Sequence, residues 1–191
     1  MQRRCAWVTE DPIYIDYHDN EWGIPIYDSH RLFEFLILEG AQAGLSWITV
    51  LKKRENYRSC FDNFDPKKIA RYGEKEINKL LNNAGIIRNR LKIESAIINA
   101  SAYLKLQSEG NNFSDYIWSF VDDKQIKNRW ESFRSIPSKT SISDTLSKDL
   151  KKRGFKFVGS TICYAFMQAV GLVNDHTVDC MCYENKNSRA K

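Results

Sequence analysis

One carboxylate stands out because it closes a run of almost wholly apolar residues. Glu39 follows Leu32-Phe33-Glu34-Phe35-Leu36-Ile37-Leu38. On a helix, at 100° per residue, Glu39 falls on the line of Leu32 and Phe35, so it is predicted to point inward with them. A buried carboxylate needs a partner. That partner is either a backbone group or distant arginine, or a flat, polar or cationic ligand held in a pocket.

The residues after this carboxylate read Gly40-Ala41-Gln42-Ala43-Gly44-Leu45-Ser46-Trp47. Gly40 and Gly44 are predicted to break the helix and to allow close backbone approach. Ser46 is a good N-cap for a helix that carries the large aromatic ring of Trp47. Glu34, on the opposite face of the first helix, is predicted to form a solvated ion pair with the arginine one turn before it.

Cysteines and histidines near the two chain ends have the types and spacing of metal ligands. His176 and Cys180 are one helical turn apart, with Cys182 close behind, and Cys5 and His18 form the comparable pair near the N-terminus. Without Cys182 they make a Cys₂His₂ set that suits tetrahedral Zn²⁺. Four protein ligands leave no open position, so such a zinc would be structural and would join the chain ends. The alternatives are buried thiols with hydrogen-bonded histidines, or Cys182 in place of Cys180.

Two basic turns suggest a nucleic-acid partner. In the first, a helix stops at the turn Ala84-Gly85-Ile86, and a new helix begins with Arg88, Arg90 and Lys92 near its start. Free N–H groups at a helix start bind phosphate, and nearby cations add attraction. The turn resembles the helix-hairpin-helix element that grips the DNA backbone, although Pro-Gly-Val or Gly-Val-Gly is usual there. An ordinary helical hairpin with a solvated basic face has the same pattern. Gly85, Arg88 and Arg90 are candidate DNA contacts.

The second basic turn runs from Lys148 to Gly159 and interleaves cations with aromatic residues around two glycines. A helix C-terminus favours cations through its macrodipole, which explains Lys151 to Arg153. It does not explain Lys156. We take Lys152 and Lys156 as further candidate contacts to DNA phosphates.

Composition limits the class of protein. The chain has 191 residues, of which 42% are hydrophobic and 28% charged, so it can bury a core as one domain and is neither disordered nor fibrous. The net charge of +5 is compatible with a polyanion partner. We find neither an apolar stretch of about 18 residues nor an apolar signal core. We therefore expect a cytoplasmic protein with no membrane partner, whose five cysteines are thiols or metal ligands.

The periodicity of apolar residues predicts an all-α protein with strands nearly absent. Residues 5–27 are expected to be irregular, and residues 121–142 to be rich in loops. Helices are expected over 28–43, 46–61, a short stretch from 65, 73–84, 88–109, a stretch from 114, 143–153 and 158–170. Their expected N-caps include Asp28, Asp65, Ser114 and Ser143.

Eight stretches, spread along nearly the whole chain, carry a resemblance to a known family. They are Cys5-Ala6-Trp7, Tyr14 to Gly23, Leu38-Glu39-Gly40, Gln42 to Trp47, Leu51 to Arg58, Ala84 to Arg88, Lys151 to Gly159 and Gly171 to His176. Together they resemble the bacterial 3-methyladenine DNA glycosylase I family of the helix-hairpin-helix glycosylase superfamily. The departures are one extra residue before Cys5, Ala41, Thr177, Asp179, the segment 121–135 and the tail.

The resemblance implies an all-helical helix-hairpin-helix fold in which a structural zinc joins the termini. The implied ligands are Cys5, His18, His176 and Cys180, and the implied base pocket is Glu39, Tyr14, Tyr17 and Trp47. We expect one domain over 1–191 with two lobes. Residues 1–65 and 140–191 would form a zinc-bearing lobe, and residues 66–139 a helix-hairpin-helix lobe.

The implied activity is excision of 3-methyladenine from alkylated double-stranded DNA by a monomeric enzyme. The damaged nucleotide must be turned out of the duplex. Methylation at N3 makes adenine cationic, so aromatic faces attract it by roughly 0.5–2 kcal/mol each. Glu39 can accept a hydrogen bond from the exocyclic amine and balance the charge, which makes it the expected catalytic residue. Gly44 or Leu45 would fill the gap in the duplex.

The resemblance also implies that the reaction stops at release of the base. The usual catalytic aspartate of the superfamily has no counterpart that we can identify, and no lysine stands out as a Schiff-base nucleophile. We therefore expect a monofunctional enzyme in which water attacks an oxocarbenium-like sugar, with no strand nicking. Two rival functions are a module of this fold that recognises damage without cutting, and a zinc hydrolase with water on the metal.

Overall fold

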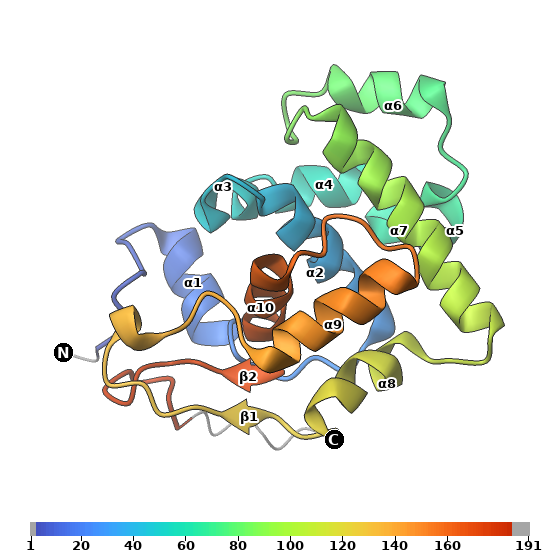
Figure 1. Ribbon diagram of the computed structural model, residues 1–191. Coiled ribbons are helices and arrows are strands. Elements are labelled where there is room, and N and C mark those ends of the chain that lie inside the picture. Colours follow the sequence, from blue (N-terminus) through green and yellow to red (C-terminus); the bar gives the residue numbers. More distant parts are fainter. Residues whose placement is uncertain (1–2, 185–191) are drawn as a thin grey trace.

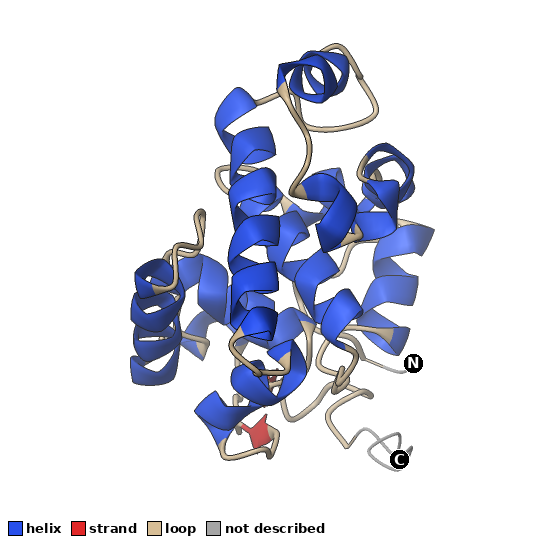
Figure 2. Ribbon diagram, turned by 90° about the vertical axis from the view of Figure 1, so that its right-hand side faces the viewer, coloured by secondary structure: helices blue, strands red, loops and turns tan. Residues whose placement is uncertain are grey.

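The computed structural model describes residues 3–184, in which regular structure is almost wholly helical (Figures 1 and 2). The α-helices are α1 (Pro12–Asn20), α2 (Ser29–Gln42), α3 (Trp47–Leu51), α4 (Arg54–Cys60), α5 (Pro66–Ile69), α6 (Glu74–Leu81), α7 (Arg90–Ser108), α8 (Phe113–Trp118), α9 (Ser141–Lys152) and α10 (Ser160–Ala169). Two short strands, β1 (Ile126–Lys127) and β2 (Val173–Asn174), pair in parallel. The predicted all-α class is confirmed. No helix within residues 3–184 is long and apolar enough to cross a membrane.

Helix α2 forms the centre of the core. Its buried side chains face nearly all directions, and it contacts α3, α7, α8 and α10. Figure 1 shows α2 and α10 in the middle of the molecule, with α1 and α3 on one side and α7 and α8 on the other. A helix that is apolar all round can be stable only when other elements surround it. The C-terminal end of α2, which carries Glu39, is therefore fixed by the whole core.

Several helix starts agree with the predicted caps. The Asp28 side chain accepts a hydrogen bond from the Arg31 N–H, and the Asp65 side chain accepts one from the Lys67 N–H. The predicted caps of α8 and α9 are wrong, because other residues cap these helices. Asn112 caps α8 two residues before Ser114, and Thr140 caps α9 three residues before Ser143. Ser143 instead completes a capping box by accepting a hydrogen bond from the Thr140 N–H.

Two predictions of helix extent are also wrong. The segment 5–27 is not irregular throughout, because Asp11 caps α1 and Pro12 occupies its first position. The single helix expected over 46–61 is two helices, α3 and α4. The Lys53 N–H donates to the Val50 carbonyl three residues back, which interrupts the α-helical ladder. The Lys53 ammonium donates to the Ala84 carbonyl at 2.6 Å and so ties the break to the α6–α7 turn.

The two glycines after Glu39 differ in what they do. Gly40 does not break α2, which continues to Gln42. A Cβ at Gly40 would lie 3.3 Å from the Cβ of Phe157, so Gly40 allows the close approach that was predicted. Gly44 lies after the helix with a φ of +77°, a conformation that favours glycine.

Glu34 corrects another prediction. It is paired with Arg31 as expected, at 3.2 Å, but it is only 3% exposed rather than solvated. The Arg58 guanidinium, from α4, lies 2.8 Å from its other oxygen. A buried carboxylate is stable when it is paired and hydrogen-bonded, and Glu34 meets this condition. The contrast with Glu39 on the same helix is informative, because Glu39 has no such partner.

Candidate active site and metal centre

A cavity of about 210 Å³ lies beside the C-terminal end of α2. The four residues predicted to form a base pocket all line it, namely Tyr14, Tyr17, Glu39 and Trp47. Six other residues line it as well, namely Trp7, Trp22, Gln42, Phe133, Ala165 and Gln168. The lining comes from the N-terminal segment, α1, α2, α3, α10 and the 3₁₀ turn Phe133–Ser135, so it is assembled from parts of the chain far apart in sequence.

Three buried polar atoms of this cavity have no hydrogen-bond partner. They are Glu39 Oε2, Trp7 Nε1 and Trp47 Nε1, and they are the only buried side-chain nitrogen or oxygen atoms without one among the described residues. Buried polar groups in folded proteins are almost always paired. Because all three residues line the cavity, these atoms are candidates for contact with a ligand that carries donors and acceptors.

Burial strongly perturbs Glu39. Its side chain is 3% exposed, and desolvation raises the pKa of its carboxyl from 4.5 to about 8. At neutral pH the carboxyl therefore holds its proton when no charged ligand is present. A cation in the cavity would favour the carboxylate and lower this pKa again. The site is thus poised to become negative when a positive ligand enters.

Aromatic rings form most of the wall around Glu39. The rings of Tyr17 and Trp47 lie 5.4 Å apart, and the ring of Trp7 lies 4.9 Å from Tyr14 and 5.0 Å from Trp22. Burial raises the pKa of the Tyr17 hydroxyl well above its ordinary value, so Tyr17 stays neutral. Aromatic faces attract desolvated cations. Aromatic faces beside an ionisable carboxyl group are the groups that hold a planar cation.

The structure brings the four predicted metal ligands together. Cys5, His18, His176 and Cys180 are all buried, and one ligand atom from each lies within 4.8 Å of the others. The measured sulfur–nitrogen distances are 3.5 Å for Cys5 to His176, 3.5 Å for Cys180 to His176 and 3.4 Å for Cys180 to His18. A tetrahedral zinc places its sulfur and nitrogen ligands about 3.5 Å apart. The residues therefore fit such an ion.

Neighbouring groups orient both histidine rings for this purpose. His18 Nδ1 lies 2.7 Å from Asp19 Oδ1, which leaves Nε2 to face the cysteines. His176 Nε2 lies 3.1 Å from the Trp22 carbonyl oxygen, which leaves Nδ1. Such outer contacts are typical of metal-bound histidines. The Cys182 sulfur lies outside this group, 3.9 Å from the other nitrogen of His18, Nδ1, and makes a second possible group with His18 and Asp19.

The Cys₂His₂ cluster packs against two of the aromatic residues that line the cavity. The Trp22 ring packs edge-on against His176 at 4.7 Å, and the Trp7 ring packs edge-on against His18 at 5.2 Å. The sequence placed Trp7 and Trp22 beside metal ligands but did not indicate that they line the pocket. Phe133, Ala165 and Gln168 had no signal of this kind, because they become neighbours only in the folded chain. Gln42 belongs to the stretch Gln42 to Trp47 that carries the resemblance, and it follows Glu39 by one helical turn.

The predicted helical hairpin is present between α6 and α7. Gly85 is required there, because a Cβ would lie 2.9 Å from both Asn56 and Asn83. The Gly85 N–H donates to Asn83 Oδ1 at 2.7 Å. Arg88 is exposed and forms no ion pair within residues 3–184. Arg90 is held at 2.7 Å from Glu74 and 3.2 Å from Glu94.

Lys92 does not face solvent as a phosphate contact, which corrects the prediction from its position. Its ammonium donates to the carbonyl oxygens of Ala41 at 2.8 Å and Ala43 at 2.7 Å. These carbonyls end α2, where a cation satisfies orphan acceptors. Lys92 therefore fixes the segment between Glu39 and Gly44, with Leu45, which is 41% exposed, just beyond it.

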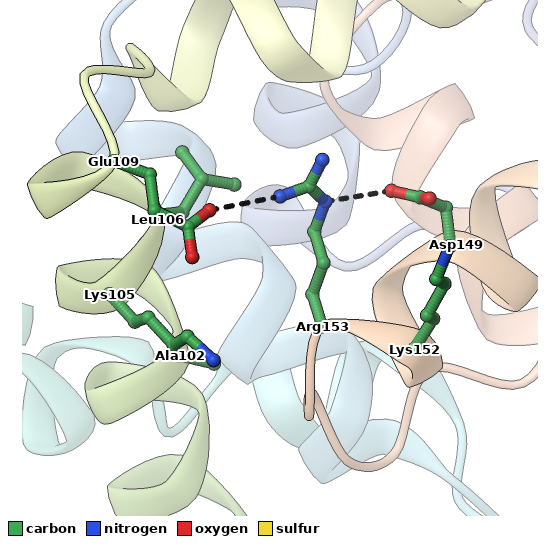
Figure 3. Close-up of a pocket in the computed structure, with 7 residues that line it drawn as sticks. All are labelled: Ala102, Lys105, Leu106, Glu109, Asp149, Lys152 and Arg153. Atoms are coloured by element: carbon green, nitrogen blue, oxygen red, sulfur yellow. Dashed lines mark hydrogen bonds and ion pairs between the residues drawn. The ribbon is translucent and has the colours of Figure 1, made fainter.

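The two other predicted DNA contacts lie apart from each other. Lys156 is exposed, and its backbone is clamped by Asn99, which accepts from its N–H at 2.7 Å and donates to its carbonyl at 3.0 Å. Lys152 lines a separate cavity of about 230 Å³ between α7 and α9, together with Lys105. Figure 3 shows Arg153 in that cavity between two carboxylates, those of Glu109 and Asp149.

Comparison with known proteins agrees with this geometry. A family model described as methyladenine glycosylase matches residues 7–183. The chain is 60% identical to DNA-3-methyladenine glycosylase 1 of Escherichia coli (strain K12), over 94% of this chain and 96% of the relative. A crystal structure of a 3-methyladenine DNA glycosylase I superposes with a TM-score of 0.93 at 59% identity, over 94% of this chain and 99% of that one. The 3-methyladenine DNA glycosylase I of Staphylococcus aureus, solved to explain 3-methyladenine recognition, gives a TM-score of 0.92 at 39% identity, over 96% and 98% of the two chains. The chain belongs to the methyladenine glycosylase family.

Proposed function

We propose that this protein is a DNA repair glycosylase that excises 3-methyladenine from alkylated double-stranded DNA. The observation that carries the proposal is Glu39, a buried and unpartnered carboxyl group in a cavity walled by aromatic rings. Relatives with this activity in their names, and a structural neighbour that recognises 3-methyladenine, support the same substrate.

Recognition begins when the damaged nucleotide leaves the base stack. Unstacking costs a few kcal/mol, and contacts in the cavity offset this cost. The methylated adenine is positive, so Trp47 and Tyr17 attract it through their faces. Glu39 loses its proton as the cation enters, and its carboxylate then accepts a hydrogen bond from the exocyclic amine. Neutral adenine lacks the charge that drives this ionisation, which makes charge the basis of selectivity.

Cleavage then requires little acid catalysis. A neutral purine needs a proton before it can leave the sugar, whereas adenine methylated at N3 and still bonded to the sugar is already a cation. The bond to the sugar breaks with its electron pair on the base, which leaves as neutral 3-methyladenine. Water adds to the oxocarbenium-like sugar and gives up a proton to solvent. No lysine lines the cavity in the described part of the chain, so we propose a monofunctional enzyme that leaves the strand intact.

The Cys₂His₂ cluster is proposed to hold a structural Zn²⁺. Cys5, His18, His176 and Cys180 supply four ligands, so the ion would have no open position for substrate or water. Its contribution is to join the two ends of the chain and to support Trp7 and Trp22 from behind.

The proposed DNA-binding surface is made of the segment after α2 and the two basic turns. Gly44 or Leu45 would fill the space left by the extruded nucleotide. The backbone contacts are proposed to be Gly85, Arg88, Arg90, Lys152 and Lys156. We propose that the enzyme acts as a monomer. We also propose that it acts in the cytoplasm, because its relatives are bacterial and bacterial DNA lies there.

Release of free base from methylated duplex DNA tests the proposal. We expect the wild-type protein at stoichiometric concentration to release 3-methyladenine, and Glu39→Gln to release it at least about 100-fold more slowly while remaining folded. Glu109→Gln removes an exposed carboxylate elsewhere and should retain the wild-type rate. Damage-specific DNA binding without any release would favour the rival function of a recognition module. A metal with three protein ligands and a bound water would favour the zinc hydrolase.

A further inference from the structure

Phe133 enters the cavity from a segment that supplies no other residue of its lining. It belongs to the 3₁₀ turn Phe133–Ser135, between β1 and α9, whereas most of the lining comes from α1, α2, α3 and α10. Figure 1 shows this turn as a short gold coil beside α1. Phe133 is 44% exposed, so its ring is not part of the packed core. Aromatic side chains are typical of the lining of ligand cavities, so its place there makes Phe133 a candidate ligand contact.

The backbone on either side of Phe133 is fixed. The Trp130 carbonyl accepts from the Val178 N–H at 2.9 Å, and the Trp130 indole N–H donates to the Asp175 carboxylate at 2.8 Å. The Ser132 hydroxyl caps the 3₁₀ turn, and the Ile136 N–H donates to the Phe133 carbonyl. The pairing of β1 with β2 anchors the start of the same segment. These contacts fix the backbone that carries Phe133 beside the cavity.

We propose that Phe133 contacts the extruded methylated base and sets how tightly this enzyme holds it. The inference rests on the proposed function and extends it to a residue in the segment 121–135, which departs from the family pattern. An aromatic ring there adds a further face for a planar cation. It also excludes water from the side of the cavity nearest the surface, which strengthens the attraction between Glu39 and the base.

Substitutions of Phe133 test this role. We expect Phe133→Ala to weaken binding of 3,9-dimethyladeninium, which keeps the positive charge of the damaged nucleotide, about 3- to 10-fold, the range typical of one aromatic contact. The readout is the fluorescence of the tryptophans that line the cavity. Phe133→Tyr should bind as the wild type does. Phe133→Leu, which keeps apolar cover but loses the ring face, should fall between the two.

A matched control uses an exposed aromatic residue outside the cavity. Tyr27 is 57% exposed and stacks on Trp118 at 4.4 Å. Tyr27→Ala should bind 3,9-dimethyladeninium with unchanged affinity. Because Phe133 is half exposed, Phe133→Ala should also keep the wild-type melting temperature. If the melting temperature of Phe133→Ala falls, the base affinities of Phe133→Leu and Phe133→Tyr test the role of the ring, because both variants keep the bulk of the side chain.

The outcomes separate this proposal from the proposed function. Wild-type protein that neither binds 3,9-dimethyladeninium nor releases 3-methyladenine would contradict the function itself. If the wild-type protein does both, and Phe133→Ala and Phe133→Leu bind the base as tightly as the wild type does, only the role of Phe133 is overturned. Weaker base binding with an unchanged single-turnover rate at saturating DNA would support a contact that holds the base without taking part in bond cleavage.

Discussion

At the scale of single residues, α2 carries two buried glutamates with opposite fates. Glu34 is neutralised by two arginines, Arg31 and Arg58, and serves stability. Glu39 faces the cavity with one oxygen unpaired. The unpaired Glu39 oxygen lowers the stability of the folded protein, and a bound ligand can supply the missing hydrogen bond.

The raised pKa of Glu39 predicts a pH dependence of stability. Its folded-state pKa of about 8 lies above the ordinary 4.5, so folding favours the protonated form. The stability contributed by this group is fully present below the unfolded value and is lost as pH rises through about 8. Glu39→Gln has no proton to lose. We expect its melting temperature to exceed that of the wild type by several degrees at alkaline pH, roughly 2–4 °C per kcal/mol.

Thermal unfolding of both proteins across this pH range is the measurement. Effects of other titrating groups are common to the two proteins and cancel in the difference. A difference in melting temperature that is flat with pH would show that Glu39 titrates normally in the folded state.

At the scale of elements, Lys92 connects the start of α7 to the end of α2. Lys92→Met keeps the aliphatic stem and removes the ammonium, leaving two backbone carbonyls without their donor. We expect a loss of roughly 1–3 kcal/mol in the free energy of unfolding. Weaker base binding should accompany it, because Glu39 lies just before these carbonyls.

Denaturant unfolding and base titration together check this expectation, with Lys105→Met on the same helix as the control. Equal stability of the two methionine variants would mean that the Lys92 contacts contribute nothing.

The Cys₂His₂ cluster is proposed to stabilise the fold and to take no part in the reaction. Removing the Cys180 thiol, in Cys180→Ala, should lower the melting temperature by roughly 10 °C or more, since structural zinc contributes directly to folding. Chelation should destabilise the wild type in the same way and leave the variant nearly unchanged. Metal analysis with calorimetry measures both effects. A wild type that contains no zinc and tolerates chelators would contradict a structural ion.

Most of these elements could be predicted from apolar spacing and capping residues. The inward orientation of Glu39 followed from helical periodicity, and the clustering of Cys5 with His176 followed from ligand type. Phe133 and Gln168 could not be predicted as pocket residues, because tertiary packing alone brings them to α2. The role of Lys92 was missed for the same reason, since its acceptors lie about fifty residues earlier in the chain.

At the scale of the whole molecule, three turns converge near the end of α2. They are the segment after Glu39, the hairpin around Gly85 and the turn that carries Lys156. Lys92 and the Gly40–Phe157 contact hold α7 and the 154–159 turn against α2. The division into two lobes stays a prediction, but these contacts show how distant segments of the chain, two of which carry basic residues, come to lie near the end of α2.

Salt dependence of DNA binding tests the surface. Arg88 is exposed and free of ion pairs in residues 3–184, so Arg88→Ala should reduce the slope of log affinity against log salt by about 0.9. Arg90→Ala should reduce it less, because Glu74 and Glu94 already neutralise Arg90. Titrations of duplex DNA at several salt concentrations give both slopes. An Arg88→Ala slope equal to that of the wild type would place Arg88 outside the interface.

The most direct measurement compares two ligands that differ in charge. 3,9-Dimethyladeninium is a permanent cation that is substituted at N3 and N9, as the damaged nucleoside is, with a methyl group in place of the sugar. 9-Methyladenine is its neutral counterpart. We expect the wild-type protein to bind the cation at least about 10-fold more tightly, and Glu39→Gln to lose most of that preference. Equal affinity of the wild type for the two ligands would contradict the claim that this cavity selects a damaged base by its positive charge.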